Sequence, residues 1–262
     1  MAPELKGTAF ITGAGSGIGQ SAAYTFAQHG IRGLALVDVN PTALDGTQDQ
    51  LKSKYPQLEV LVILVDVTDE GSVDMAVNKA ADQFGRIDIA VNCAGIGGVP
   101  SPTSDMPLKD WQKVIDINQT GVWLCQRAMI RQMLKQESSG LRDGRGVIVN
   151  VSSMYGVITP PAEFAIGPYT ASKHAVVALT QLDAKTYAPH AIRINAICPG
   201  YVDTPILGNA LSSGYMQPEI DKTPMRRAAK VEEISDAILF LVSPRSSFVC
   251  GASLVVDGGR SI

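Results

Sequence analysis

A tyrosine and a lysine stand four positions apart, in the run Tyr169-Thr170-Ala171-Ser172-Lys173. On a helix this spacing places the two side chains on one face, about one turn apart. A phenol with its ordinary pKa of about 10 exchanges protons poorly at neutral pH, whereas a nearby cation favours the phenolate and lowers that pKa. The pair is therefore a candidate general acid and base, although the same spacing also occurs on ordinary helix surfaces.

A glycine-rich segment near the start of the chain is the second candidate for chemistry. It has the sequence Thr12-Gly13-Ala14-Gly15-Ser16-Gly17-Ile18-Gly19, between a strand-like run and a helix-like one. Glycines permit positive φ and close backbone approach, so a pyrophosphate can bind against the free N–H groups of the helix's first turn. The spacing is T-G-x-x-x-G-x-G rather than G-x-G-x-x-G. A dinucleotide would contact Gly13, Ser16, Gly17, Ile18 and Gly19, the alternative being an ordinary strand–helix turn.

Asp38 ends the next apolar run, Leu34-Ala35-Leu36-Val37. An acidic residue at about this distance from a glycine loop binds the adenosine ribose hydroxyls. Its charge would repel a 2′-phosphate, and neither Ser16 nor Val39 is a basic residue that would attract one. The sequence therefore favours NAD over NADP, although an aspartate in a turn beside a helix is the other interpretation.

Elements that could position these groups follow from the apolar pattern. Short apolar runs alternate with amphipathic segments, as in βαβ units. The expected strands cover residues 8–11, 33–37, 59–65, 87–91, 146–151, 193–197 and 253–256. The expected helices cover 17–29, 41–55, 72–84, 108–135, 168–188 and 231–241. The strands are apolar almost throughout, which predicts a single α/β domain over 1–262, a Rossmann-like doubly wound, predominantly parallel seven-stranded sheet with helices on both faces.

Residues 201–227 form the longest irregular stretch, with prolines and glycines at Pro205, Gly208, Gly214, Pro218 and Pro224. A loop of this length in a compact domain is more often a lid or binding loop than a plain connection. We therefore expect a substrate lid there.

The motifs together resemble the compact branch of the short-chain dehydrogenase/reductase family, from Gly7 to Gly259. They occur in the family's order: the glycine loop, Asp66-Val67, Asn92-Cys93-Ala94-Gly95, Asn118, Val151-Ser152-Ser153-Met154-Tyr155-Gly156, Tyr169 with Lys173, and Pro199-Gly200 followed by Thr204. The resemblance implies the same fold and the interconversion of a secondary alcohol and a ketone with a nicotinamide cofactor.

The resemblance also implies catalytic roles. Tyr169 matches the general acid/base, and Lys173 would bind the nicotinamide ribose and lower the phenol pKa. Ser153, the serine of S-x-x-G, would polarise the substrate oxygen, with Ser152 as the alternative. Asn118 matches a helix residue whose backbone holds a water that links Lys173 to solvent. Without the family, Asn118 would be interpreted as a polar residue on a helix surface.

Further cofactor contacts are implied for three segments. Asp66 and Val67 match the adenine contacts, and Asn92, Ala94 and Gly95 match the turn beside the adenosine ribose. The nicotinamide would lie beside Tyr169, Lys173, Pro199, Gly200, Val202 and Thr204. Two departures from the family are visible: Cys93 replaces the usual second asparagine, which should affect packing, and residues 157–168 are longer than usual, which should reshape the pocket.

The expected pocket lining is apolar: Ile96, Val99, Met154, Val157, Ile158, Phe164, Ile166, Tyr201, Leu207, Leu211, Tyr215 and Met216. We expect a hydrophobic alcohol or ketone, terpenoid-like or steroid-like, with small aromatic or aliphatic alcohols next and oxidation as the favoured direction. These side chains could instead simply pack the lid. The rival functions are a non-redox binding or regulatory protein, and an epimerase, dehydratase or cyclase. The intact catalytic positions argue against these rivals.

Composition narrows the partners. A formal net charge of −3 argues against nucleic acid, and no run is long and apolar enough to span a membrane. With no recognisable secretion signal, we expect a cytoplasmic protein. The four cysteines and three histidines are scattered, which argues against disulfides and a metal site. The family resemblance implies a homotetramer built through helices 108–135 and 168–188 and the last strand.

Overall fold

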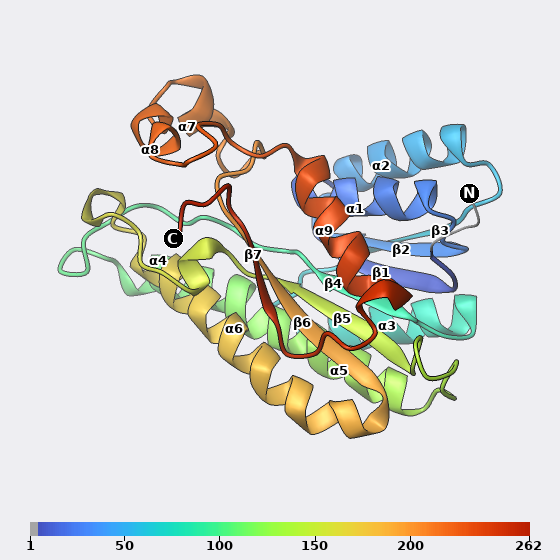
Figure 1. Cartoon of the computed structure of the whole chain (residues 1–262). Helices are drawn as coiled ribbons and strands as arrows, with labels where there is room; N and C mark the ends of the chain where they lie inside the picture. The colour runs from blue at the N-terminus through green and yellow to red at the C-terminus, as the bar shows by residue number, and fades with distance from the viewer. Residues whose placement is uncertain (1–4) are drawn as a thin grey trace.

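The protein is described by a computed structural model covering residues 5–262, without the side chain of Asn209 (Figure 1). Seven strands form one sheet in the order β3-β2-β1-β4-β5-β6-β7, and every neighbouring pair is parallel. The strands are β1 (Thr8–Thr12), β2 (Gly33–Asp38), β3 (Glu59–Leu64), β4 (Ile89–Asn92), β5 (Gly146–Val151), β6 (Ile192–Pro199) and β7 (Ser253–Val256). The strand order changes direction between β1 and β4, where open α/β sheets bind ligands at their carboxyl edge. The predicted fold class is confirmed.

Helices cover both faces of the sheet (Figure 1). One face carries α1 (Gly17–Gln28), α2 (Pro41–Lys54) and α9 (Val231–Val242), and the other carries α3 (Glu70–Phe84), α5 (Val122–Leu134) and α6 (Gly167–Tyr187). Side chains from β1 alternate between the two layers: Phe10 packs in the core on the α3/α5 side, whereas Ile11 packs against the α1/α9 side. Burial on both faces explains the nearly continuous apolar runs of the strands.

Local capping residues set the helix starts. Asn40 accepts a hydrogen bond from the backbone N–H of Ala43 (3.1 Å), and Pro41 occupies the first turn of α2, as the sequence predicts. Helix α3 begins earlier than expected, because the Asp69 carboxylate accepts from the N–H of Ser72 (2.5 Å) and caps the helix at Glu70.

The helix expected over residues 108–135 is interrupted. It consists of α4 (Leu108–Ile115), a π-helical turn at Asp116–Gly121 and α5. π-helical turns inside α-helices occur frequently at functional sites, and this one contains Asn118.

The expected lid is partly ordered into helices. It contains α7 (Gly208–Ser212) and α8 (Gln217–Asp221), and a parallel bridge between Val202 and Ala229 closes its neck. Among residues 5–262, no helix has both the length and the apolar composition needed to cross a membrane.

Candidate functional site

The glycine loop is tightly wound against the turn after β4. Gly13 and Gly17 have φ of 68° and 54°, a backbone conformation that favours glycine. A Cβ atom on Gly19 would lie 2.3 Å from the Gly13 carbonyl oxygen, so no side chain fits there. Ser16 is the N-cap of α1 and its side chain makes no capping hydrogen bond. The N–H groups of the first turn, from Gly17, Ile18 and Gly19, can therefore bind an anion.

Asp38 lies at the carboxyl end of β2, beside this loop. Its Oδ2 accepts a hydrogen bond from the N–H of Gly15 (3.0 Å), and its Oδ1 accepts from the N–H of Asn40 (3.0 Å). A Cβ on Gly15 would lie 3.0 Å from the same Oδ2. The carboxylate therefore fixes the loop while standing at the sheet edge where a ribose would bind.

The turn after β4 completes this edge of the sheet. The hydroxyl oxygen of Thr12 accepts hydrogen bonds from the N–H groups of Cys93 (3.0 Å) and Ala94 (3.1 Å), which ties β1 to β4. Asn92 is buried, and its Nδ2 donates to Asn150 Oδ1 on β5 (2.8 Å). The structure therefore places Ala94 and Gly95 directly across from the glycine loop.

Asp66 and Val67 lie after β3, on the same edge. Asp66 is exposed, and its Oδ1 accepts from the N–H (2.9 Å) and hydroxyl (2.8 Å) of Thr68. Val67 is buried, and a Cβ on Gly121 would lie 2.7 Å from its Cγ2. Val67 thus lies against the π-helical turn that carries Asn118.

Asn118 is fully buried, which corrects its interpretation as a helix-surface residue. Its Oδ1 accepts from the N–H of Ile96 and its Nδ2 donates to the carbonyl oxygen of Ile96, both at 2.8 Å. The side chain holds both backbone groups of one residue in the loop after β4. This tertiary pairing accompanies the π-helical turn at Asp116–Gly121 and anchors it beside the site.

Lys173 lies close to Asn118, next to Gly95. A Cβ on Gly95 would be 3.2 Å from Asn118 Oδ1 and 3.6 Å from the Lys173 Nζ. Lys173 is 5% exposed, and its Nζ donates to the carbonyl oxygen of Val151 (2.9 Å). Desolvation lowers the pKa of this ammonium to about 8.

Tyr169 stands one turn before Lys173 on α6, and the Lys173 Nζ lies 5.6 Å from the centre of its ring. Burial raises the pKa of the phenol, while a hydrogen bond with the Ser153 side chain lowers it. The family resemblance implies that Lys173 lowers this pKa. In the structure, the contact that lowers it is Ser153.

The two candidate serines have different surroundings. The Ser152 hydroxyl donates to the backbone carbonyl of Lys173 (2.8 Å) and thereby joins β5 to α6. Ser153 instead faces Tyr169, and its Oγ accepts from the N–H of Tyr155 (3.1 Å). This geometry favours Ser153 as the serine that contacts a substrate oxygen.

The segment after β6 connects the sheet edge to the lid. The Gly200 N–H donates to the Val256 carbonyl (3.0 Å), and Val202 forms the bridge at the neck of the lid. A Cβ on Gly17 would lie 3.4 Å from Thr204 Cγ2. Pro199, Gly200, Val202 and Thr204 therefore lie between the glycine loop and the lid.

Apolar side chains fill the space under the lid. Met154, Tyr201 and Met216 are buried in one cluster with Tyr155 and Ile220, and this cluster packs against partly buried Ile158, Phe164, Ile166, Tyr169, Leu207, Ala210, Leu211 and Ala228. Most of the expected lining is thus brought together, whereas Val99, Val157 and Tyr215 are exposed. Tyr155 and Ile220 were missed, since nothing in their sequence neighbourhood distinguishes them from ordinary core residues.

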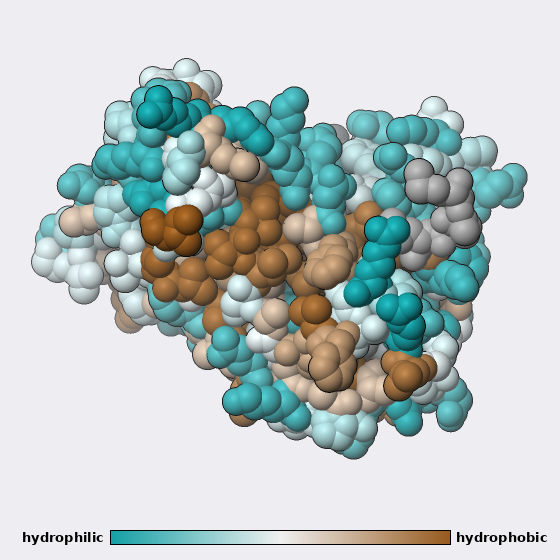
Figure 2. All heavy atoms as spheres, in the orientation of Figure 1, coloured by the Kyte–Doolittle hydropathy of each residue, from teal (hydrophilic) through white to brown (hydrophobic). Residues whose placement is uncertain are grey.

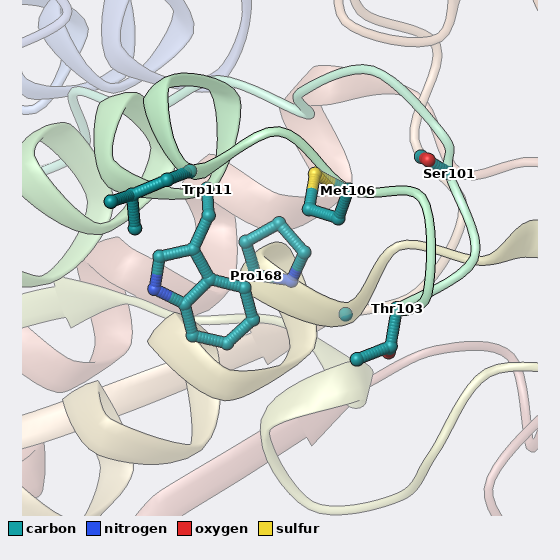
Figure 3. Close-up of a pocket in the computed structure, with 7 residues that line it drawn as sticks. Ser101, Thr103, Met106, Trp111 and Pro168 are labelled. Atoms are coloured by element: carbon teal, nitrogen blue, oxygen red, sulfur yellow. The ribbon is translucent and has the colours of Figure 1, made fainter.

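A cavity of about 260 Å³ lies beside this cluster, at the start of α6 (Figure 3). It is lined by Ser101, Thr103, Met106, Leu108, Trp111, Gly167 and Pro168. Figure 3 shows the Trp111 indole and the Pro168 ring facing one another across it. None of these residues belongs to the expected apolar lining, although Pro168 immediately precedes Tyr169.

The described part of the chain contains no group of three or more His, Cys, Asp or Glu side chains arranged to hold a metal ion. All four cysteines are free thiols.

Comparisons with known proteins agree with this geometry. A family model described as "Enoyl-(Acyl carrier protein) reductase" matches residues 13–261. The short-chain dehydrogenase anuF of Penicillium roqueforti is 42% identical, with 100% of this chain and 98% of the relative covered. The cis-4-hydroxycyclohexanecarboxylate dehydrogenase of Sinomonas cyclohexanicum is 38% identical, with 96% and 95% covered.

Solved structures are similar over the same length. Levodione reductase has a TM-score of 0.90 at 33% identity, with 97% of each chain covered. The 3-ketoacyl-(acyl-carrier-protein) reductase of Brucella melitensis, solved with NADH, has a TM-score of 0.86 at 32% identity, with 98% of each chain covered. The sheet order, the corner formed by Tyr169, Lys173 and Asn118, and these full-length relatives lead to one conclusion: the chain belongs to the short-chain dehydrogenase/reductase family of oxidoreductases.

Proposed function

We propose that the chain is an NAD-dependent dehydrogenase/reductase that interconverts a secondary alcohol and a ketone on a hydrophobic substrate. The observation that carries the proposal is the meeting of Ser153, Tyr169, Lys173 and Asn118 at the carboxyl edge of the sheet, beside the glycine loop. A binding or regulatory protein would have no need for a buried lysine at this place, since burying an ammonium costs stability.

Each side chain has a role in proton movement. The substrate oxygen would bind between the Ser153 hydroxyl and the Tyr169 phenol, which already contact one another. In oxidation the Tyr169 oxygen takes the hydroxyl proton, and in reduction the phenol returns it. The hydrogen bond with Ser153 favours the phenolate of Tyr169, Lys173 would bind the nicotinamide ribose beside it, and Asn118 holds the loop at Ile96 in place. A bound nicotinamide would accept the hydride from the carbon in oxidation and supply it in reduction.

The residues that line the edge of the sheet fit a dinucleotide. Gly13, Ser16, Gly17, Ile18 and Gly19 would hold the pyrophosphate at the start of α1, since its N–H groups lack a side-chain cap. Asp66 and Val67 would contact adenine, Asn92, Ala94 and Gly95 the adenosine ribose, and Pro199, Gly200, Val202 and Thr204, with Tyr169 and Lys173, the nicotinamide end. The Asp38 carboxylate supports NAD over NADP, because a 2′-phosphate would be placed against its negative charge.

The apolar cluster under the lid supports a hydrophobic substrate, terpenoid-like or steroid-like. The side chains under the lid are mostly aliphatic and aromatic. Two of the three basic residues on the lid bind carboxylates: Arg227 binds both carboxylate oxygens of Glu233 (2.6 and 2.7 Å), and Lys222 binds Glu219. Two relatives carry names that refer to a hydroxycyclohexanecarboxylate and to levodione, which supports a small-molecule alcohol or ketone as the substrate.

The test is NAD-linked turnover with a panel of hydrophobic secondary alcohols and the matching ketones. We expect absorbance of NADH to appear with the alcohols, and Tyr169→Phe to abolish it. Full turnover by Tyr169→Phe would refute the acid/base mechanism. Activity confined to charged acyl-carrier substrates would refute the proposal of a hydrophobic substrate, but not the proposal of NAD-linked interconversion of an alcohol and a ketone.

A homotetramer and a cytoplasmic location complete the proposal. β7 is an edge strand of the sheet, and Figure 2 shows apolar side chains gathered across the middle of the face where β7 lies. Val255 on β7 is 37% exposed. Leu182 on α6 is 62% and Trp123 on α5 is 40% exposed. Covering these positions with other copies would remove apolar surface from water. Light scattering that gives the mass of a monomer would contradict the tetramer.

A further inference from the structure

The segment that follows β7 is folded into a tight turn. The Asp257 carboxylate accepts hydrogen bonds from the N–H groups of Gly259 (2.9 Å) and Ser261 (2.8 Å). The turn also lies against the segment after β6, because a Cβ on Gly200 would be 2.7 Å from the Asp257 Cα. Residues 257–261 thus pack against the segment that leads from β6 to the lid.

The same turn touches the lid. A Cβ on Gly258 would lie 3.0 Å from Thr223 Cγ2, and a Cβ on Gly259 would lie 3.0 Å from Pro224 Cγ. Both glycines have positive φ, 64° and 86°, so side chains there would be strained by backbone conformation as well as by contact. This close approach brings the next residue, Arg260, up to the lid helix.

Arg260 joins the turn to α8. Its Nη2 donates to Glu219 Oε2 (2.9 Å), while Lys222 binds the other carboxylate oxygen. The Glu219 side chain is 10% exposed and the Arg260 side chain 21%, so the pair is largely shielded from water. A charge-assisted hydrogen bond in such surroundings is stronger than one on an open surface.

A second line of contacts runs from Arg260 to the catalytic serine. The guanidinium is hydrogen-bonded to the Tyr201 hydroxyl, which in turn is 2.7 Å from the Tyr155 hydroxyl. The two rings meet edge to face, with centres 6.4 Å apart. The backbone N–H of Tyr155 donates to Ser153 Oγ (3.1 Å). One arginine is therefore linked both to the lid and, through two tyrosines, to the segment that carries Ser153.

We propose that Arg260 is a positioning residue, which holds helix α8 of the lid over the pocket through Glu219 and keeps the segment of Ser153 in place through Tyr201 and Tyr155. The proposal rests on the dehydrogenase function for its kinetic consequence, since a lid held in place lowers the concentration of alcohol needed for half-maximal rate. Its structural consequence, the immobilisation of α8, does not depend on the reaction.

The experiment compares Arg260→Gln, Glu219→Gln and the double variant with the wild-type chain. The matched control is Arg32→Gln, which removes an Arg–Glu pair of similar length (2.9 Å, to Glu59) at the opposite end of the sheet. Three quantities are measured: KM and kcat for an alcohol that the wild type oxidises, the Kd of NADH by fluorescence, and backbone hydrogen exchange in a peptide spanning residues 217–223.

We expect Arg260→Gln to raise KM by about tenfold, the effect of losing one partly buried charge-assisted hydrogen bond. The Kd of NADH should stay within about twofold of the wild-type value, since Arg260 does not touch the cofactor edge. Hydrogen exchange in 217–223 should become faster. Glu219→Gln should behave similarly, and the double variant should be no worse than the more affected single one, because both changes break the same link.

Arg260→Gln with wild-type KM and wild-type exchange in 217–223 would overturn the proposal, as would strictly additive effects in the double variant. A lowered melting temperature without either change, the behaviour expected of Arg32→Gln, would also overturn it. If the wild-type chain oxidised no alcohol, the proposed function would fall, and the exchange measurement would still decide whether Arg260 holds α8. Should Arg260→Gln not fold, Glu219→Gln tests the same contact from the lid side.

Discussion

Replacing Lys173 by methionine should remove the desolvation cost of a buried ammonium that the proposed reaction requires. Desolvation lowers the pKa of Lys173 from 10.5 to about 8, and at about 1.4 kcal/mol per pKa unit the buried ammonium costs about 3 kcal/mol at neutral pH. Methionine is of similar length and carries no charge, but it leaves the Val151 carbonyl without its 2.9 Å donor, which costs about 1–3 kcal/mol. We expect Lys173→Met to be inactive and about as stable as the wild type at pH 7, or more stable.

The decisive quantity is how the difference between the two proteins changes with pH. The folded-state pKa lies below the unfolded-state one, so unfolding takes up a proton between about pH 8 and pH 10.5. Raising the pH through this window therefore stabilises the wild-type fold, and Lys173→Met lacks that gain. Between about pH 7 and about pH 9.5, the free energy of unfolding of the wild type should rise by about 2 kcal/mol relative to that of the variant. Other titrating groups occur in both proteins and cancel in the difference.

The assay is urea unfolding of the cofactor-free proteins at both pH values and one protein concentration, followed by circular dichroism. Lys185→Met, which replaces an exposed lysine on the same helix, is the control, and its difference from the wild type should not change with pH. A difference between the wild type and Lys173→Met that stays constant within about 0.5 kcal/mol would refute the claim that Lys173 is held in a desolvated, pKa-lowering environment.

Four further substitutions test individual residues of the site. Ser153→Ala should lower kcat by about 10² because it removes a donor to the substrate oxygen. Ser152→Ala should instead lower the melting temperature and leave kcat within about tenfold of the wild-type value, since the Ser152 hydroxyl donates to the Lys173 carbonyl oxygen. Equal losses of kcat in the two variants would contradict the assignment of Ser153 to the substrate oxygen. Asp38→Asn keeps the shape but removes the charge, so the ratio of NADP to NAD dissociation constants, measured by calorimetry, should fall by about tenfold or more; an unchanged ratio would exclude Asp38 as the discriminating residue. Gly19→Ala would place a Cβ 2.3 Å from the Gly13 carbonyl, so NAD binding by calorimetry should weaken by about 10² or more, and wild-type affinity would contradict the observed loop geometry.

The sequence predicts those parts of the fold that local patterns determine. Strands β1, β2, β4, β5 and β6 are buried on both faces, so each is a short apolar run whose predicted limits fall within a few residues of the observed ones. The Asn40-Pro41 start of α2 follows from capping alone. The site residues follow strand ends or lie on one helix face, and parallel strands bring their carboxyl ends together, so the motif order already indicates one shared edge.

Features that depend on distant partners could not be predicted in this way. The π-helical turn at Asp116–Gly121 accompanies the pairing of Asn118 with Ile96, 22 residues away, and leaves no trace in the apolar period. Helices α7 and α8 have five residues each, too short to show a helical period. The contact of Arg260 with Glu219 joins residues 41 positions apart, with α9 and β7 between them.

The strand order also has a consequence for synthesis. On one side β1 pairs with β2, which is close in sequence: Thr8 lies opposite Gly33. On the other side β1 pairs with β4, which is much further along the chain: Ala9 lies opposite Ile89. While the chain is being made, β1 to β3 can assemble into a small sheet whose apolar β1 edge stays open until residues 89–92 have emerged. An open edge of this kind can pair with other chains. Refolding from denaturant should therefore lose yield to aggregation as protein concentration rises.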